Sequence, residues 1–335
     1  MSSLLSYEPY VNECIDIFID RMLHLSRSGD AIDMVHWFQC FAFDIMGAIT
    51  YSSRFGFLDR GEDIEGVLKA LDRSMVYSTL VGIYAWAHPY LYAIMEKIPG
   101  SGAAGRNYLM RFVSERIEAR NQERSRRSDC KLKKIVHGEG TPRDFLEKLT
   151  EAHEADPVKV TPYHIFMMGL SNIIAGSDTT AISLSSILVN LITTPAALSR
   201  LKREIEAQPR TEGRITFKTA NNMPYLQAVI KEALRIHPAT GLPFWRVVPE
   251  GGAVVAGQHF EAGAIVGVNS WVAHFDRAVF GDDAHIFRPE RWLEAEENPD
   301  RFRQMEANYM PVSQRLAALY PKTHKAVAGF LERNR

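Results

Sequence analysis

An acid and an alcohol stand side by side within a long apolar run of this sequence, in the hexapeptide Ala175-Gly176-Ser177-Asp178-Thr179-Thr180. Burying an unpaired carboxylate is costly, so Asp178 requires an explanation. A positioned acid–alcohol pair can relay protons in a site that excludes water, and Gly176 would let a flat ligand or O2 approach the backbone. On this functional interpretation, Asp178 and Thr179 are the candidate catalytic residues.

Two structural explanations compete with this functional one. Residues 163–193 are long and mostly apolar, which is typical of a transmembrane helix, although His164, Asn172, Asp178 and Asn190 count against it. An aspartate at the centre of a bilayer alone costs about 2.5–3.5 kcal/mol. Alternatively, neighbouring alcohols could satisfy the acid inside a core helix. The hexapeptide alone leaves the functional and the core explanations open.

A second constellation lies in Lys231-Glu232-Ala233-Leu234-Arg235, where Glu232 and Arg235 are three residues apart and share a helix face. Such a pair is usually a surface salt bridge worth less than about 1 kcal/mol. The surrounding residues instead indicate a well-packed helix, and a partly buried guanidinium favours bidentate carboxylate acceptors. Arg291, from a distant segment, could complete a Glu–Arg–Arg cluster.

The elements that must position these residues are mostly helical. Apolar periodicity predicts helices over these ranges: 8–27, 31–52, 63–97 with a break near Pro89, 105–125, 161–193, 195–207 and 224–237. Thr161-Pro162 marks the start of the helix that carries Asp178. We expect that helix to run without a break to about Thr193, a length of about 50 Å.

After Pro238 the pattern changes. Residues 247–268 alternate apolar side chains with turns at Gly251-Gly252, Gly257 and Gly263, which predicts a small antiparallel sheet. A short helix at about 270–280 and an irregular segment from Phe287 to Trp292 follow. The predicted fold class is mainly α with a small antiparallel β region.

Composition narrows the classes of protein. The chain has 335 residues, of which 46% are hydrophobic and 24% charged, with a net charge of −1. This balance argues against a nucleic-acid partner. The cysteines Cys14, Cys40 and Cys130 are too few and odd in number for a disulfide scaffold, which indicates a reducing compartment. The basic break at 126–142 is predicted as a solvated loop, with membrane-surface or partner docking as the alternative.

Taken together, these segments resemble the cytochrome P-450 superfamily, the haem-thiolate monooxygenases. Ala175 to Thr180 resembles the oxygen-activation motif of the family's central helix, and Glu232 with Arg235 fits its Glu-x-x-Arg motif. Pro289-Glu290-Arg291-Trp292 is similar to the family's Pro-Glu-Arg-Phe segment. Arg246, within Phe244 to Pro249, matches a position that commonly pairs with a haem propionate. The local sequence around these motifs is similar to that of eukaryotic microsomal members, including those of fungal secondary metabolism.

The resemblance implies a function and roles for each residue. It implies haem as cofactor, O2 as oxidant, an NADPH-dependent reductase as electron donor and oxidation of a small apolar substrate. Asp178 and Thr179 would deliver protons, while Ala175, Gly176 and Arg246 would contact the haem. Glu232, Arg235 and Arg291 would form a structural triad. The substrate pocket is expected before Ala175 on the long helix and in the segment after Pro238.

The sequence departs from the family pattern at both ends. No signal peptide or membrane anchor is visible at the N-terminus, so we expect this chain to be cytoplasmic as given, whereas a complete member is expected at the cytosolic face of the endoplasmic reticulum. The cysteine that would ligate iron is expected just after Pro311, where Met310-Pro311-Val312-Ser313-Gln314-Arg315 stands, and no cysteine follows Cys130.

The domain prediction and the alternative function follow from this departure. Residues 1–311 are predicted as a partial P-450-like domain and residues 312–335 as a divergent tail. No metal ligand is assigned, because Tyr320 and His324 lack the glycine-rich setting of the family's haem loop. The alternative function is a non-catalytic, haem-free remnant or scaffold protein.

Overall fold

The structure is a computed structural model that describes residues 5–129 and 144–311. The chain forms two compact units that divide between Ala181 and Ile182, inside helix α10 (Ser177–Thr193). The predicted tail at 312–335 and most of the predicted loop at 126–142 lie outside the described residues. Helix α7 runs to Asp129, four residues into the range predicted as a break.

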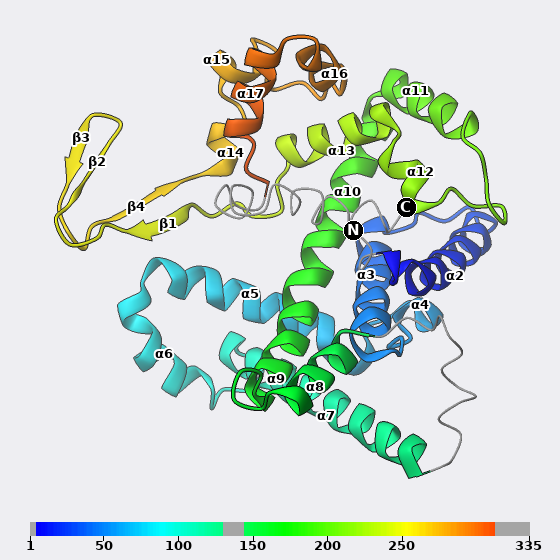
Figure 1. The fold of residues 1–335 in the computed structure, drawn as a ribbon, viewed down its shortest axis with the longest axis vertical. Helices are drawn as coiled ribbons and strands as arrows, with labels where there is room; N and C mark the ends of the chain where they lie inside the picture. Colours follow the sequence, from blue (N-terminus) through cyan, green and yellow to red (C-terminus); the bar gives the residue numbers. More distant parts are fainter. Residues whose placement is uncertain (1–4, 130–143, 312–335) are drawn as a thin grey trace. The chain divides into compact units, whose positions relative to one another are not determined.

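The first unit is helical throughout (Figure 1). Its elements are α2 (Glu8–Ser26), α3 (Met34–Tyr51), α4 (Phe57–Arg60), η1 (Ile64–Gly66), α5 (Val67–Ile83), η2 (Ala85–Ala87), α6 (His88–Met95), α7 (Gly102–Asp129), α8 (Phe145–Ala155), α9 (Pro162–Ser171), η4 (Asn172–Gly176) and the start of α10. Helix α3 is the centre of this unit, since every residue from Cys40 to Tyr51 is buried. It contacts α2, α4, α7, α8 and η4, which explains why its apolar residues cover every face.

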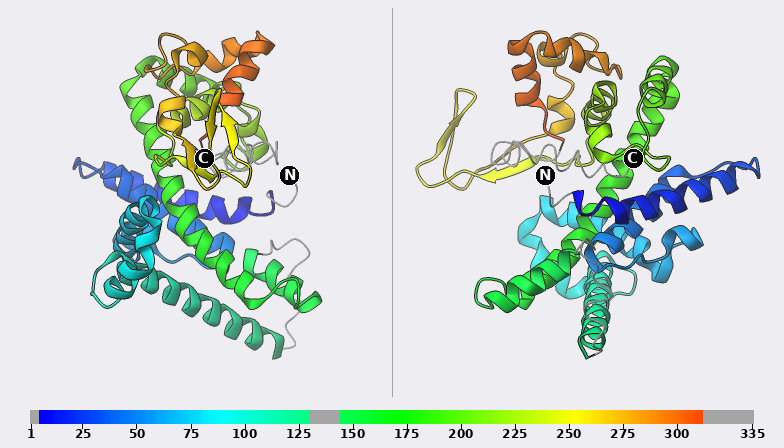
Figure 2. Two further views of the ribbon diagram at one scale, coloured as in Figure 1. Left: turned by 90° about the vertical axis from the view of Figure 1, so that its left-hand side faces the viewer. Right: turned by 45° about the vertical axis from the view of Figure 1, so that its right-hand side comes forward.

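Helices α5 and α7 approach each other closely because α7 begins with small residues (Figure 2). A Cβ atom on Gly102 would lie 2.1 Å from the Tyr77 Cβ, and one on Gly105 would lie 2.6 Å from the Ala70 carbonyl oxygen. Backbone atoms cannot move aside as a flexible side chain can. The two glycines therefore set the distance between these helices.

The helix predicted to run unbroken over 161–193 is present from Pro162 to Thr193 and contains one irregular turn. Helix α9 passes into a π-helical turn, η4, before α10 resumes regular α geometry at Ser177. The helix therefore reaches Thr193 as predicted, and only the π turn inside it was not predicted, because a π turn keeps the chain helical. Such turns occur frequently at functional sites.

The second unit combines short helices and strands. After the rest of α10 come α11 (Pro195–Glu206), α12 (Phe217–Asn221), α13 (Pro224–Ile236), α14 (Ser270–Ala273), α15 (Arg277–Phe280), α16 (Glu290–Glu296) and α17 (Pro299–Asn308). The helix predicted at 270–280 is two helices, since Asp276 caps a new start by accepting from the Ala278 N–H at 2.8 Å. Arg291 and Trp292 belong to α16 and not to an irregular segment.

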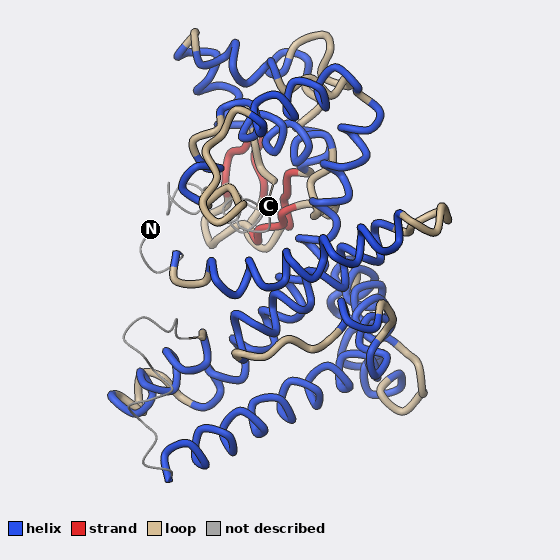
Figure 3. Tube along the Cα trace, turned by 90° about the vertical axis from the view of Figure 1, so that its right-hand side faces the viewer, coloured by secondary structure: helices blue, strands red, loops and turns tan. Residues whose placement is uncertain are grey.

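The strands form two separate antiparallel pairs. Strand β1 (Phe244–Val247) pairs with β4 (Ile265–Val268), with Arg246 opposite Val266. Strand β2 (Ala253–Val255) and β3 (Gln258–Phe260) form a hairpin whose turn holds Ala256 and Gly257 at positive φ. Helices dominate the described residues and the strands occur only in the second unit (Figure 3). The predicted fold class is confirmed.

Within the described ranges, no single helix has the length and apolarity to cross a bilayer. One pair of consecutive helices, Pro162–Thr193 and Pro195–Glu206, meets this requirement by length and composition alone. The two helices meet at a bend of 110°.

Candidate active site

In the second unit the structure brings Glu232, Arg235 and Arg291 together, and all three are completely buried. Arg235 forms a bidentate pair with Glu232, with Nε–Oε2 at 2.9 Å and Nη2–Oε1 at 2.8 Å. The Arg291 Nε donates to the same Oε1 at 2.9 Å. The i,i+3 spacing on α13 places the first pair on one face, and α16 supplies the second guanidinium.

Further donors and acceptors complete this cluster, and sequence reasoning missed them. The Trp292 Nε1–H donates to Glu232 Oε2 at 2.9 Å, and the Arg288 backbone N–H donates to Oε1 at 3.1 Å. Arg235 Nη1 also donates to the carbonyls of His274 and Ala284, each at 2.7 Å. A buried ion pair is stable only where its remaining donors and acceptors are satisfied, and here they are.

Asp283 extends the cluster toward solvent. Its carboxylate accepts from Arg291 Nη1 at 2.8 Å and from Arg288 Nε at 2.6 Å. Burial opposes its ionisation, but the hydrogen bonds from these two guanidinium groups outweigh that effect and lower the pKa of Asp283 to about 2. Asp283 is therefore ionised at neutral pH.

In the first unit, the surroundings of Asp178 are sparser. Its carboxylate is half-buried, and its one hydrogen bond among the described residues is a long contact of 3.5 Å from the Gln39 side-chain amide of α3. Burial raises the pKa of Asp178, the Gln39 hydrogen bond opposes the shift, and the charge of Asp72 adds to it. An acid whose protonated form is favoured in this way is suited to hold and release a proton.

Thr179 lies next to this acid on an exposed face. Its Oγ1 donates to the Ala175 carbonyl at 2.6 Å, and Thr180 repeats the arrangement with Gly176 at 2.7 Å. These bonds satisfy carbonyls in and beside the π turn, where the regular helix bonds change register. Ala175 and Thr179 are both exposed and lie four residues apart, so they share one face of the helix.

Gly176 has a packing role that the sequence did not reveal. A Cβ at this position would lie 2.3 Å from the Met46 Sδ of α3. The missing side chain therefore leaves room for the Met46 side chain against the π turn. Contact between Gly176 or Ala175 and a cofactor stays a prediction.

Arg246 projects from strand β1 and is exposed. Its Nη1 donates to the Trp245 carbonyl at 2.7 Å, and within the described residues it has no ion pair with a carboxylate. The guanidinium keeps donors for an external anion, and a carboxylate fits its planar, fork-like geometry.

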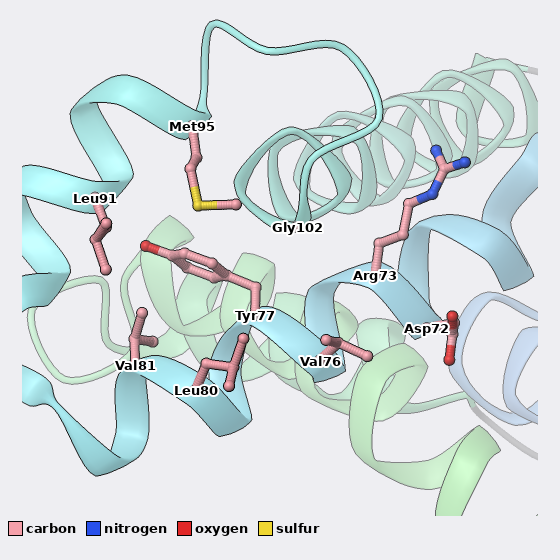
Figure 4. Close-up of a pocket in the computed structure, with 9 residues that line it drawn as sticks. All are labelled: Asp72, Arg73, Val76, Tyr77, Leu80, Val81, Leu91, Met95 and Gly102. Atoms are coloured by element: carbon pink, nitrogen blue, oxygen red, sulfur yellow. The ribbon is translucent and has the colours of Figure 1, made fainter.

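A cavity of about 250 Å³ lies where α5, α6 and the start of α7 meet. Figure 4 shows the Tyr77 ring at its centre, between Met95 above and Leu80 below, with Leu91 and Val81 beside it. Its walls are almost wholly apolar, apart from Asp72 and Arg73 at one end. This cavity lies outside the segments where the substrate pocket is expected, before Ala175 and after Pro238, and that expectation stays a prediction. Residues 74–95 contain no Asp, Glu, Lys or Arg, a pattern that could have predicted an apolar surface here.

Comparison with known proteins identifies the lineage. The sequence model of the family described as Cytochrome P450 matches residues 1–313. A cytochrome P450 monooxygenase of Aspergillus terreus is 36% identical over 313 residues, covering 91% of this chain and 61% of the relative. A pisatin demethylase of Fusarium vanettenii is 39% identical, covering 89% of this chain and 56% of the relative.

A third relative, the cytochrome P450 monooxygenase cicH of Emericella nidulans, is 37% identical, with 89% of this chain and 58% of that protein covered. The chain thus spans less than two thirds of the length of the curated relatives it matches. The family match covers nearly the whole described chain, including the Asp178 motif, the Glu232 cluster and Arg246. The chain therefore belongs to the cytochrome P450 family.

Proposed function

We propose that this chain functions as a haem-dependent monooxygenase that oxidises a small apolar molecule in secondary metabolism. The observation that carries the proposal is the acid–alcohol pair Asp178–Thr179 immediately after the π turn. Family membership and the monooxygenase names of the relatives support the reaction class.

Two features of the described residues fit a haem. The exposed Arg246 guanidinium has donors for a propionate carboxylate. The face that carries Ala175 and Thr179 combines a small side chain with a hydroxyl, so a flat apolar group could approach it. When bound, haem supplies the activation of O2 that no protein side chain can perform.

The contribution of the protein is proton delivery. Because burial favours the neutral form of Asp178, that carboxyl can hold a proton and pass it on. The Thr179 hydroxyl, bonded to the Ala175 carbonyl, can rotate to carry the proton further along the exposed face. Glu232, Arg235 and Arg291 hold their part of the scaffold through buried hydrogen bonds.

The partners follow from the reaction class. We propose an NADPH-dependent reductase as electron donor and the cytosolic face of the endoplasmic reticulum as the location. The apolar cavity at Tyr77 supports an apolar substrate.

Coupling of O2 use to product formation tests the role of Thr179. Thr179→Ala should raise the share of NADPH oxidation that yields peroxide at least about tenfold, since general acid catalysis is typically worth 10²–10⁴-fold. The matched control is Thr193→Ala, because Thr193 is another exposed alcohol of α10 with the same type of bond, to the Val189 carbonyl at 2.8 Å. Equal coupling in both variants would contradict the proposal.

Haem binding separates the proposed function from the alternative. The purified chain should take up haem with a saturable change in absorbance, and Arg246→Gln should weaken that uptake. A chain that folds but takes up no haem would favour the non-catalytic scaffold protein. A haem spectrum without the thiolate-type shift on adding carbon monoxide would indicate another iron ligand.

A further inference from the structure

His274 is completely buried, and each of its two ring nitrogens forms a hydrogen bond with the backbone. Its Nδ1 lies 3.0 Å from the Arg235 carbonyl oxygen, and the Met310 N–H donates to its Nε2 at 2.7 Å. An amide can donate only to an unprotonated ring nitrogen. The ring is therefore neutral, with its proton on Nδ1, where it donates to Arg235.

The connection to Arg235 is reciprocal. The Arg235 guanidinium donates to the His274 carbonyl at 2.7 Å, while the His274 ring donates to the Arg235 carbonyl. The ring of Tyr309 stacks on the imidazole at a centroid distance of 5.6 Å, and Phe280 meets it edge-on at 6.3 Å. His274 thus has one preferred orientation, set by α13 on one side and by the residues after α17 on the other.

We propose that His274 is a positioning residue that fixes the backbone of Tyr309-Met310-Pro311 to the Glu232–Arg235–Arg291 cluster. The reason for fixing this segment rests on the proposed function, because the iron ligand of the family is expected after it. The fixing itself is argued from the structure alone. The geometry that carries it lies wholly in the second unit.

Protonation of the ring would break this link. Burial lowers the pKa of His274 to about 4, with the Arg235 charge contributing and the Arg235 carbonyl and Glu232 opposing. The other groups near it are the Tyr309 phenol, whose pKa burial raises well above its usual range, and the uncharged Phe280 of α15. Below pH 4 the Nε2 would carry a proton and could no longer accept from Met310.

Two substitutions separate the two bonds of the ring. His274→Gln places an amide oxygen near the former Nε2 and can still accept from Met310. His274→Asn places an amide N–H near the former Nδ1 and can still donate to Arg235, but it offers Met310 no acceptor. His259→Gln is the matched control, since the His259 side chain is 54% exposed in the same unit.

Hydrogen exchange of the Met310 amide, corrected for intrinsic rates, is the readout. In the unmodified chain and in His259→Gln, protection should be high at pH 7 and fall at least about tenfold as pH drops from 6.5 to 4. His274→Gln should keep the protection without the pH dependence. His274→Asn should lose at least about tenfold at every pH, while the Arg288 amide, which donates to Glu232, stays protected.

Two results would overturn the proposal. One is wild-type protection of Met310 in His274→Asn. The other is equal loss at Met310 and Arg288 in His274→Gln, which would reduce His274 to a general packing residue. Should His274→Asn not fold, the pH profile of the unmodified chain decides, and a flat profile between pH 6.5 and 4 overturns the proposal. None of these readouts depends on haem, so they can fail while the proposed function stands.

Discussion

Glu232 of α13 and Asp178 of α10 are both carboxylates set in apolar helices, yet different numbers of donors reach them. Glu232 is completely buried and accepts from Arg235, Arg291, Arg288 and Trp292 at 2.8–3.1 Å. Asp178 is half-buried and, among residues 5–129 and 144–311, accepts one hydrogen bond, at 3.5 Å from Gln39. The first arrangement fixes a carboxylate in place through several donors, whereas the second leaves an acid whose pKa burial raises.

The largest expected effect comes from removing the charge at Glu232. Glu232→Gln removes the carboxylate that pairs with the buried Arg235 guanidinium and leaves Arg291 paired with Asp283. This loss should destabilise the fold by about 3–5 kcal/mol. Urea unfolding at pH 7 measures the change. The control is Glu306→Gln, where a 33% exposed carboxylate pairs with Lys231 at 3.0 Å and where we expect less than about 1 kcal/mol. Similar losses in both variants would show that the cluster is no more than a surface-type pair.

A smaller effect should follow when one donor is removed from the same cluster. Trp292→Phe keeps the aromatic packing but removes the Nε1–H that reaches Glu232, which should cost about 1–2 kcal/mol. Trp271→Phe serves as control, because its Nε1–H bonds to the Pro238 carbonyl at 3.0 Å in a side chain that is 43% exposed. The comparison of the two carboxylates would lose its basis if the Trp271 change cost as much.

Asp178→Asn should change the free energy of unfolding in the opposite direction and stabilise the fold. Because burial raises the pKa of Asp178 above its unfolded value, the ionised carboxylate costs stability at pH above the folded pKa, and this cost disappears as pH falls through it. The neutral amide should therefore stabilise the chain at pH 7 by up to about 1 kcal/mol, a gain typical of relieved functional sites. Unfolding at pH 7 and at pH 3.5 should show the gain only at the higher pH.

A surface carboxylate provides the control for the stability change expected of Asp178→Asn. Asp300→Asn changes a side chain that is 88% exposed and should leave stability unchanged at both pH values. Destabilisation by Asp178→Asn at pH 7 would mean that the carboxylate is held as firmly as Glu232.

Sequence patterns could predict local relations better than distant ones. The i,i+3 spacing of Glu232 and Arg235 and the proline start of the helix at Pro162 follow from helix geometry, and both are present. The donors from Trp292 and Arg288 lie in a segment whose path depends on the tertiary fold. The contact between Gln39 and Asp178 spans 139 residues. No local pattern encodes such pairs.

The backbone irregularity of the long helix was hidden for a related reason. A π turn adds one residue to a helix turn without changing which residue types are apolar, so the run from Pro162 to Thr193 looked continuous. The sequence predicts that Gly176 lets a ligand approach the backbone. Its packing partner Met46 lies on a helix far away in the sequence, so no local pattern indicated that contact. The fold class depended only on composition and period, and it was predictable.

Titration of the aspartate carboxyls by carbon NMR tests the contrast between the two regions most directly. Asp178→Asn and Asp283→Asn variants assign the two signals. We predict that Asp178 titrates above the ordinary aspartate value of 3.8 and that Asp283, at the edge of the Glu232 cluster, titrates at about 2. An Asp178 carboxyl that titrates at or below 3.8 would contradict its role as a proton carrier.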